Sequence, residues 1–249
     1  MKADSTFKIK YATSNPSQSL QKHICGKLNF IKDVRGAHDP LYNKLKHKYL
    51  FALGEIPKRQ ASSSPKINEL LSSLWVLSSD KAMITGTAFE LRNIGVVTCA
   101  HVYKEDTVAF RAENENITYK TTLKHIDYKQ DLAIIELIDA PPTQGLELRT
   151  QQVARLEKCM VAGFPNHNIG DTGYICPGYI TGTRNSLSRK RILISAPIIA
   201  GNSGGPVVDD SNKVIGVAAT GADDILPVNA TENYGVIPSV YIQKLATQR

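Results

Sequence analysis

Residues 201–206 read Gly201-Asn202-Ser203-Gly204-Gly205-Pro206. Glycine adopts a positive φ angle without steric cost, so this run predicts a tight turn that presents the hydroxyl of Ser203. The backbone N–H groups of Gly201 and Ser203 can then point into one small space, where an oxyanion would develop during acyl transfer. The stretch therefore predicts a nucleophilic serine with its own oxyanion hole.

A serine is a weak nucleophile unless a base and an orienting group accompany it. His101 ends the apolar run 96–100, and Asp131 comes directly before the apolar run 132–135. Each residue also has a simpler interpretation. The run around Ser203 consists of residues that are common in ordinary turns. A histidine beside apolar residues, such as His101, is often a core residue, and an aspartate such as Asp131 often precedes a strand. Together, in the order His, Asp, Ser, they predict a catalytic triad.

The sequence resembles the trypsin-like serine proteases, and within them the HtrA/Deg branch. The resemblance covers residues 72–246 and rests on five motifs in family order. These motifs are 85–89 (TGTAF) before the histidine, 97–102 (VTCAHV), 131–134 (DLAI), 161–165 (VAGFP) and 234–239 (YGVIPS), with the serine turn between the last two.

The resemblance implies a mostly β protein with two six-stranded antiparallel β-barrels of the chymotrypsin type and a C-terminal helix. It implies a serine endopeptidase in which Ser203 attacks a peptide carbonyl, His101 moves the proton and Asp131 orients the imidazole. An extended substrate is expected to pair with the segment Val217-Ala218-Ala219. No zymogen-type Ile-Val-Gly-Gly run occurs, and the sequence shows no PDZ module after the protease region.

The residues before the serine indicate the specificity. In trypsin-like members, the charge that selects Lys or Arg lies six residues before the nucleophile, and here that residue is Pro197, followed by Ile198. We therefore expect a small or medium apolar P1 residue. Asp223 and Asp224 leave the alternative open that an acid reaches the rim of the pocket.

The hydrophobic pattern agrees with the implied fold. From residue 74 onward, short apolar runs alternate with turn residues, and a last helix is predicted from Ser239 to about Thr247. We predict two parts, a basic helical extension and linker over 1–65 and a protease domain over 66–249. The predicted strands are 74–79, 83–91, 94–98, 107–111, 117–124, 132–138, 157–163, 174–183, 191–195, 206–209, 213–219 and 233–237.

The net charge of +7 comes from the N-terminal extension. Residues 1–65 hold twelve Lys and Arg against four Asp and Glu. Apolar side chains recur at helical spacing over 20–31 and 41–53, and the run 61–65 (ASSSP) is typical of a linker. Three roles stay open for the extension, namely packing on the protease or a second subunit, docking to an acidic partner such as nucleic acid or an anionic membrane, and regulation of the cleft.

The four cysteines show no metal-ligand spacing, so the sequence predicts no metal and no cofactor. Cys159 and Cys176 fall on a predicted hairpin, which allows one disulfide without requiring it. The N-terminus lacks an apolar signal segment, and no run is long enough to span a membrane, so we expect a cytoplasmic protein. The alternative function is a catalytically latent protease-fold module recruited through the basic extension. The sequence sets neither the substrate nor the oligomeric state.

Overall fold

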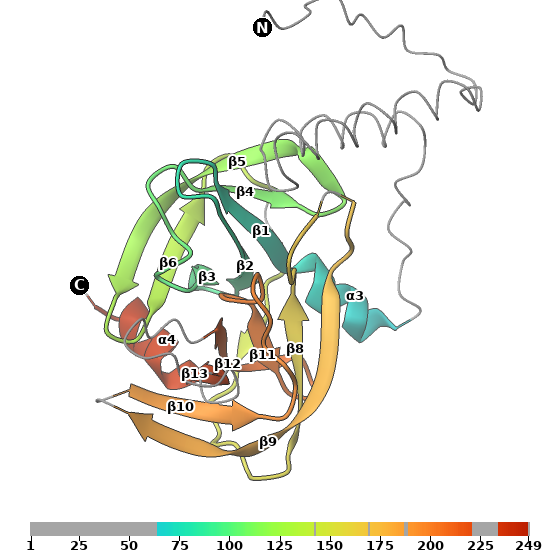
Figure 1. The fold of residues 1–249 in the computed structure, drawn as a ribbon, viewed down its shortest axis with the longest axis vertical. Helices are drawn as coiled ribbons and strands as arrows, with labels where there is room; N and C mark the ends of the chain where they lie inside the picture. Colours follow the sequence, from blue (N-terminus) through green and yellow to red (C-terminus); the bar gives the residue numbers. More distant parts are fainter. Residues whose placement is uncertain (1–63, 142, 169, 187–188, 221–233, 249) are drawn as a thin grey trace, which may run out of the picture. The chain divides into compact units, whose positions relative to one another are not determined.

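The computed structural model describes residues 64–141, 143–168, 170–186, 189–220 and 234–248. Strands dominate this part of the chain, with one short helix at each end (Figure 1). The elements are α3 (Pro65–Ser72), β1 (Leu74–Ser79), β2 (Ile84–Leu91), β3 (Gly95–Thr98), β4 (Val108–Arg111), β5 (Asn114–Asp127), β6 (Leu132–Leu137), β7 (Glu147–Leu148), β8 (Lys158–Gly163), β9 (Tyr174–Ser186), β10 (Arg189–Ile194), β11 (Pro206–Val208), β12 (Lys213–Thr220), β13 (Tyr234–Pro238) and α4 (Ser239–Ala246).

The first six strands form a closed antiparallel barrel in the order β1-β2-β3-β6-β5-β4, closed by pairing of β1 with β4. Strand β1 pairs with β2 over its whole length, from Leu74 opposite Phe89 to Ser79 opposite Ile84. Residues 74–77 are all buried, because one face of a strand in a small barrel fills the interior while the other packs on neighbouring elements. This barrel carries the residues on either side of His101 and Asp131.

The second barrel contains β8 to β13 in the order β11-β8-β9-β10-β13-β12, and pairing of β11 with β12 closes it. The short strand β7 adds to β12 in parallel, with Glu147 opposite Lys213. The interior is apolar and includes Cys159, Ile180 and Ile198. The two closed barrels and the C-terminal helix confirm the predicted chymotrypsin-like fold.

The two barrels share one apolar core. The cluster that includes Trp75 and Phe89 of the first barrel continues to Val217 of the second. Helix α4 completes it, because its buried side chains Ile242 and Leu245 belong to the same cluster. Burial of apolar surface common to both barrels therefore fixes the barrels against each other.

The twelve predicted strands correspond to twelve of the thirteen observed ones, with ends that differ by up to three residues. Strand β2 begins one residue later than predicted because Met83 has φ +52° and belongs to the turn. Two elements were not predicted, namely β7, which has only two residues, and α3, whose first residue, Pro65, falls in the predicted linker. Proline at the first helical position was the available signal for α3. The predicted helices over 20–31 and 41–53 lie outside the described residues.

Among the described residues, the cysteines Cys99, Cys159 and Cys176 are free thiols. Cys159 lies opposite Gly178 and Cys176 lies opposite Val161, so the two are diagonal neighbours on the hairpin. No helix within the described ranges has the length and apolar character needed to cross a membrane.

The packing of the core predicts that two leucine-to-alanine substitutions have very different effects on the free energy of unfolding. Leu77 is fully buried between Gly86 and Ala109 on the adjacent strands, whereas Leu156 is 74% exposed. We expect Leu77→Ala to lower the free energy of unfolding by about 2–5 kcal/mol, because it leaves a cavity in a closed barrel. Leu156→Ala is the matched control and should change it by less than about 0.5 kcal/mol. Equal effects in chemical denaturation would contradict the placement of Leu77 in the core.

Candidate active site

His101 and Asp131 are joined by two hydrogen bonds. Nδ1 of His101 lies 2.8 Å from Oδ2 of Asp131, and the backbone N–H of His101 donates to Oδ1 of Asp131 at 3.0 Å. A carboxylate only accepts hydrogen bonds, so Nδ1 carries the proton and Nε2 is left as the basic nitrogen. The His101 side chain is 36% exposed, which leaves the imidazole accessible from solvent.

The backbone at Asp131 explains how its side chain reaches His101. Asp131 has φ +64°, in the left-handed region that few non-glycine residues adopt. The same turn directs its carbonyl to the N–H of Ala100, at 3.2 Å. Backbone and side chain of Asp131 therefore bind two consecutive residues, Ala100 and His101, and fix the loop after β3.

Ser203 lies on a turn between β10 and β11 that contains two glycines with positive φ, Gly201 at +92° and Gly204 at +88°. Gly204 N–H donates to the carbonyl of Ala218 at 2.8 Å, and the N–H of Ala218 donates to the carbonyl of Gly205 at 2.8 Å. No described residue accepts a hydrogen bond from the N–H of Gly201. The turn is thus anchored to β12, with one backbone donor left over at the position predicted for the oxyanion hole.

Gly201 and Gly204 are required in this turn by close packing as well as by their positive φ angles. A Cβ atom on Gly204 would overlap the carbonyl oxygen of Thr87 and Oγ1 of Thr98. A Cβ atom on Gly201 would lie 2.8 Å from the backbone nitrogen of Asn166. The serine turn is therefore pressed against β2 and β3 of the first barrel on one side and the loop after β8 on the other.

Thr87 of β2, which the sequence analysis quoted in a motif without assigning a role, holds the turn from the first barrel. Its Oγ1 donates to the carbonyl of Gly201 at 2.7 Å and accepts from the N–H of Phe164 at 3.0 Å. Its backbone N–H donates to the carbonyl of Ser203 at 2.9 Å. Thr87 is fully buried. One residue of the first barrel therefore fixes the two positions from which an oxyanion hole would be built.

A second buried side chain, Asn202, was also missed. Its amide is fully buried, and no described residue forms a hydrogen bond with either of its polar atoms. A Cβ atom on Gly163 would lie 2.8 Å from Oδ1 of Asn202. The glycine of the motif 161–165 thus leaves the space that Asn202 occupies under the turn.

Cys99, two residues before His101, connects the loop of the base to the second barrel. Its Sγ donates to the carbonyl of Ala218 at 3.4 Å, the same carbonyl that accepts from Gly204. Burial, followed by the nearby charge of Asp131, raises the pKa of the Cys99 thiol well above its usual value. The thiol is therefore protonated at neutral pH.

The structure places the predicted substrate-binding residues in different environments. Pro197 is exposed, but Ile198 is almost fully buried in the core of the second barrel. Val217, Ala218 and Ala219 lie on β12, and both backbone groups of Ala218 are used by the serine turn. Pairing with a substrate would therefore use the end of β12 from Ala219 onward. Asp223 and Asp224 lie outside the described residues.

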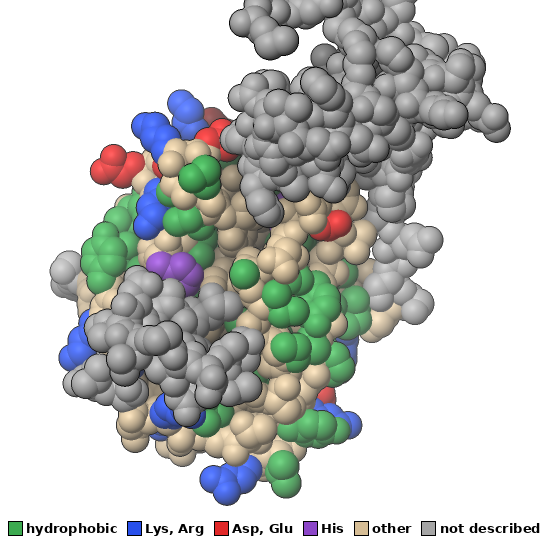
Figure 2. All heavy atoms as spheres, in the orientation of Figure 1, with side chains coloured by type: hydrophobic (Ala, Val, Ile, Leu, Met, Phe, Trp, Pro, Cys, Tyr) green, Lys and Arg blue, Asp and Glu red, His purple; other side chains and the backbone are tan. Residues whose placement is uncertain are grey.

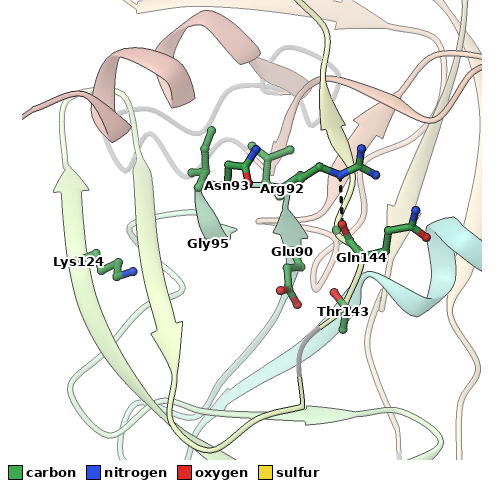
Figure 3. Close-up of a pocket in the computed structure, with 10 residues that line it drawn as sticks. Glu90, Arg92, Asn93, Gly95, Lys124, Thr143 and Gln144 are labelled. Carbon is green, nitrogen blue, oxygen red and sulfur yellow. Dashed lines mark hydrogen bonds between the residues drawn. The ribbon is translucent and has the colours of Figure 1, made fainter.

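The first barrel also carries a surface pocket (Figure 3). Figure 3 shows Arg92 reaching across it, where its Nε donates to the carbonyl of Gln144 at 3.4 Å. Arg92 also pairs with Glu147, so the cation is already neutralised. The pocket contains none of the predicted site residues. Its lining residues are Glu90, Leu91, Arg92, Asn93, Ile94, Gly95, Lys124, Thr143, Gln144 and Gly145.

Two closed antiparallel barrels that share a core and carry a His–Asp pair beside a serine turn define the class of chymotrypsin-fold hydrolases. A family model of the trypsin-like peptidase domain matches residues 85–217, more than half of the sequence. The chain therefore belongs to the trypsin-like peptidase family, which confirms the resemblance found in the sequence.

Relatives of HtrA type support the same placement. The zebrafish (Danio rerio) serine protease HTRA1A is 32% identical over 219 residues, which is 82% of this chain and 43% of that protein. HTRA1B of the same species is 28% identical over 80% of this chain and 40% of that protein. Protease Do-like 2, chloroplastic, of Arabidopsis thaliana is 30% identical over 66% of this chain and 28% of that protein. The chain spans less than half of the length of these relatives.

Solved structures agree in fold. The active form of the Rv3671c protease from M. tuberculosis superposes with a TM-score of 0.60, at 20% identity, over 76% of this chain and 88% of that one. The inactive form gives a TM-score of 0.59 over 76% of this chain and 97% of that one.

The contacts of Thr87 predict that Thr87→Val is costly although the two side chains have the same shape. The substitution leaves the carbonyl of Gly201 and the N–H of Phe164 without a buried partner, at about 1–3 kcal/mol each. Thr121→Val is the matched control, because Oγ1 of the buried Thr121 makes one hydrogen bond, to the carbonyl of Thr107. We expect thermal and denaturant unfolding to show the larger loss for Thr87→Val. A loss no larger than that of Thr121→Val would contradict the role assigned to Thr87.

Proposed function

We propose that this protein is a serine endopeptidase whose catalytic triad is His101, Asp131 and Ser203. The observation that carries the proposal is the bidentate contact between Asp131 and His101, which leaves Nε2 as the free basic nitrogen. A structural aspartate at a strand start needs no such pairing with an accessible imidazole. The membership in the trypsin-like peptidase family supports the same assignment.

In the proposed reaction, His101 Nε2 takes the proton of Ser203 as Oγ attacks the carbonyl carbon of the scissile peptide. The imidazolium formed is stabilised by the carboxylate of Asp131, and it then delivers the proton to the leaving amine. An acyl-enzyme on Ser203 remains, and water attacks it by the same sequence in reverse. Asp131 stays ionised throughout, because its role is to orient and stabilise the ring.

The N–H groups of Gly201 and Ser203 are proposed to bind the oxyanion of the tetrahedral intermediate. Two contacts support this role, since Thr87 holds the carbonyls of both residues and so sets the orientation of the peptide groups around them. Donors that are fixed before the reaction need no reorganisation when charge develops, and one such donor is worth roughly 10²–10³ in rate.

We propose a small or medium apolar P1 preference, with the substrate paired as a strand at the end of β12. Pro197, which is exposed, stands at the sequence position where a selecting acid would be. Figure 2 shows hydrophobic side chains gathered over β8 and β9, on the barrel that carries the serine turn. An apolar surface of this kind suits an extended peptide with apolar side chains.

The triad predicts labelling by a fluorophosphonate probe, which reacts with activated serines. Wild-type protein should be labelled, and Ser203→Ala should lose the label while keeping its unfolding transition. Ser195→Ala is the matched control, because Ser195 lies in the same barrel and only accepts a hydrogen bond from the N–H of Tyr179. It should be labelled like the wild type.

Failure of the folded wild type to react would contradict the proposal. That result would favour the alternative function, in which the protein is a catalytically latent module of protease fold that works through a binding partner. Labelling that persists in Ser203→Ala would mean that another serine is the nucleophile.

The specificity proposal is tested with a peptide library that varies the P1 residue. We expect cleavage after small or medium apolar residues, because Pro197 and not an acid stands six residues before Ser203. A preference for Lys or Arg would contradict the apolar pocket. The double variant Asp223→Asn, Asp224→Asn then tells whether those two acids supply the charge, since it would abolish such a preference.

A further inference from the structure

Three different metal-binding side chains converge beside the base. Sγ of Cys99, an imidazole nitrogen of His101 and a carboxylate oxygen of Asp131 all lie within 4.8 Å of one another. A tetrahedral ion with bonds of 2.0–2.3 Å holds its ligands about 3.3–3.8 Å apart. The separations between the three donor atoms, at most 4.8 Å, are therefore within about 1 Å of the spacing that a bound ion requires.

The donor set indicates which ion would bind. Thiolate, imidazole and carboxylate together are typical of zinc, whereas Mg²⁺ and Ca²⁺ prefer oxygen ligands alone. We propose that Cys99, His101 and Asp131 form a three-ligand site for Zn²⁺, and that zinc bound there inhibits the enzyme. The inhibition rests on the proposed function, while the binding site does not.

The geometry gives the mechanism of inhibition. Zinc would take Nδ1 of His101 and an oxygen of Asp131, the two atoms whose hydrogen bond orients the base. Binding releases the Nδ1 proton and the thiol proton to solvent, because only the deprotonated ligands bind metal. With both atoms held by the ion, the hydrogen bond that orients the imidazole toward Ser203 is lost, so the base is no longer positioned for the reaction.

Two of the three proposed ligands, His101 and Asp131, are partly exposed to solvent, whereas the third, Cys99, is buried. Cys99 is fully buried, but the side chains of Asp131 and His101 are 20% and 36% exposed, so an ion can enter from the side of the imidazole. Three protein ligands leave a fourth position for water. Arg191 donates to the carbonyl of Gln130, the residue directly before Asp131.

The spacing of these three residues along the sequence does not indicate a metal site. The sequence analysis predicted no metal because the cysteines show no ligand pattern, and Asp131 is thirty residues from His101. Pairing of β3 with β6 brings the two segments together, and the buried thiol that precedes the histidine then becomes the third donor.

The experiment measures zinc inhibition and metal binding separately on the full chain. Peptide cleavage is titrated with Zn²⁺, and each variant is compared with its own zinc-free rate. In parallel, Co²⁺ replaces Zn²⁺, and the thiolate-to-cobalt charge-transfer absorption reports a Cys ligand. The test variant is Cys99→Ala, and the matched control is Cys159→Ala, because Cys159 is an equally buried free thiol in the core of the second barrel.

We expect zinc to inhibit the wild type and Cys159→Ala alike, and both to show the charge-transfer band. Cys99→Ala should lose the band and need at least about tenfold more zinc for the same inhibition, the loss expected when a metal site is disrupted. Cys99→Ser, with nearly the same volume, should behave like Cys99→Ala and serves if the alanine variant does not fold. Equal zinc sensitivity of the Cys99 variants and the wild type, or a cobalt band that survives in them, would overturn the proposal. A wild-type protein without peptidase activity that still shows a Cys99-dependent band would contradict only the proposed function.

Discussion

The turn that carries Ser203 belongs to the second barrel, but the first barrel fixes its conformation. Thr87 holds the carbonyls of Gly201 and Ser203 and also binds Phe164, so one fully buried residue connects three segments of the site. The N–H of Phe164 is buried and the carbonyl of Gly201 is partly buried, so leaving either without a partner would cost desolvation of that group. The turn is therefore stable in this form only while the two barrels are packed together.

The same dependence applies to the base. Asp131 adopts a left-handed backbone conformation and uses both carboxylate oxygens on His101, so the loop after β3 and the start of β6 form one unit. Cys99 extends this unit to Ala218 of β12, whose carbonyl also accepts from the turn of Ser203. The proposed base and the proposed nucleophile are thus connected through backbone groups of both barrels, and a shared apolar core holds those barrels in place.

This arrangement also explains why control by a metal ion is physically reasonable at this place. A triad needs an imidazole with an oriented, protonated Nδ1, and any cation that competes for that nitrogen removes the base. An alanine at position 99 would leave only two donors beside the ring. The thiol of Cys99 adds a third donor of the kind that zinc prefers, and it is fully buried while the side chain of His101 is partly exposed.

Much of the fold could be predicted from the sequence, because the partly buried strands of a barrel produce short apolar runs separated by turn residues. Twelve strands, the final helix and the barrel architecture followed from apolar runs between turn residues and from motifs in family order. The positions missed were those without a local pattern, such as the two-residue β7, and α3, where Ser and Pro suit a linker as well as a helix start.

The sequence by itself determined which residues we propose for the chemistry, since His101, Asp131 and Ser203 lie in motifs whose residue types are recognisable along the chain. Only the tertiary structure decided what surrounds them. Thr87 and Cys99 form hydrogen bonds with residues far away in the chain, with Thr87 separated from Gly201 by 114 positions and Cys99 from Ala218 by 119. Such contacts arise from strand pairing and barrel packing, which bring distant buried polar groups to one point, and no local pattern encodes them.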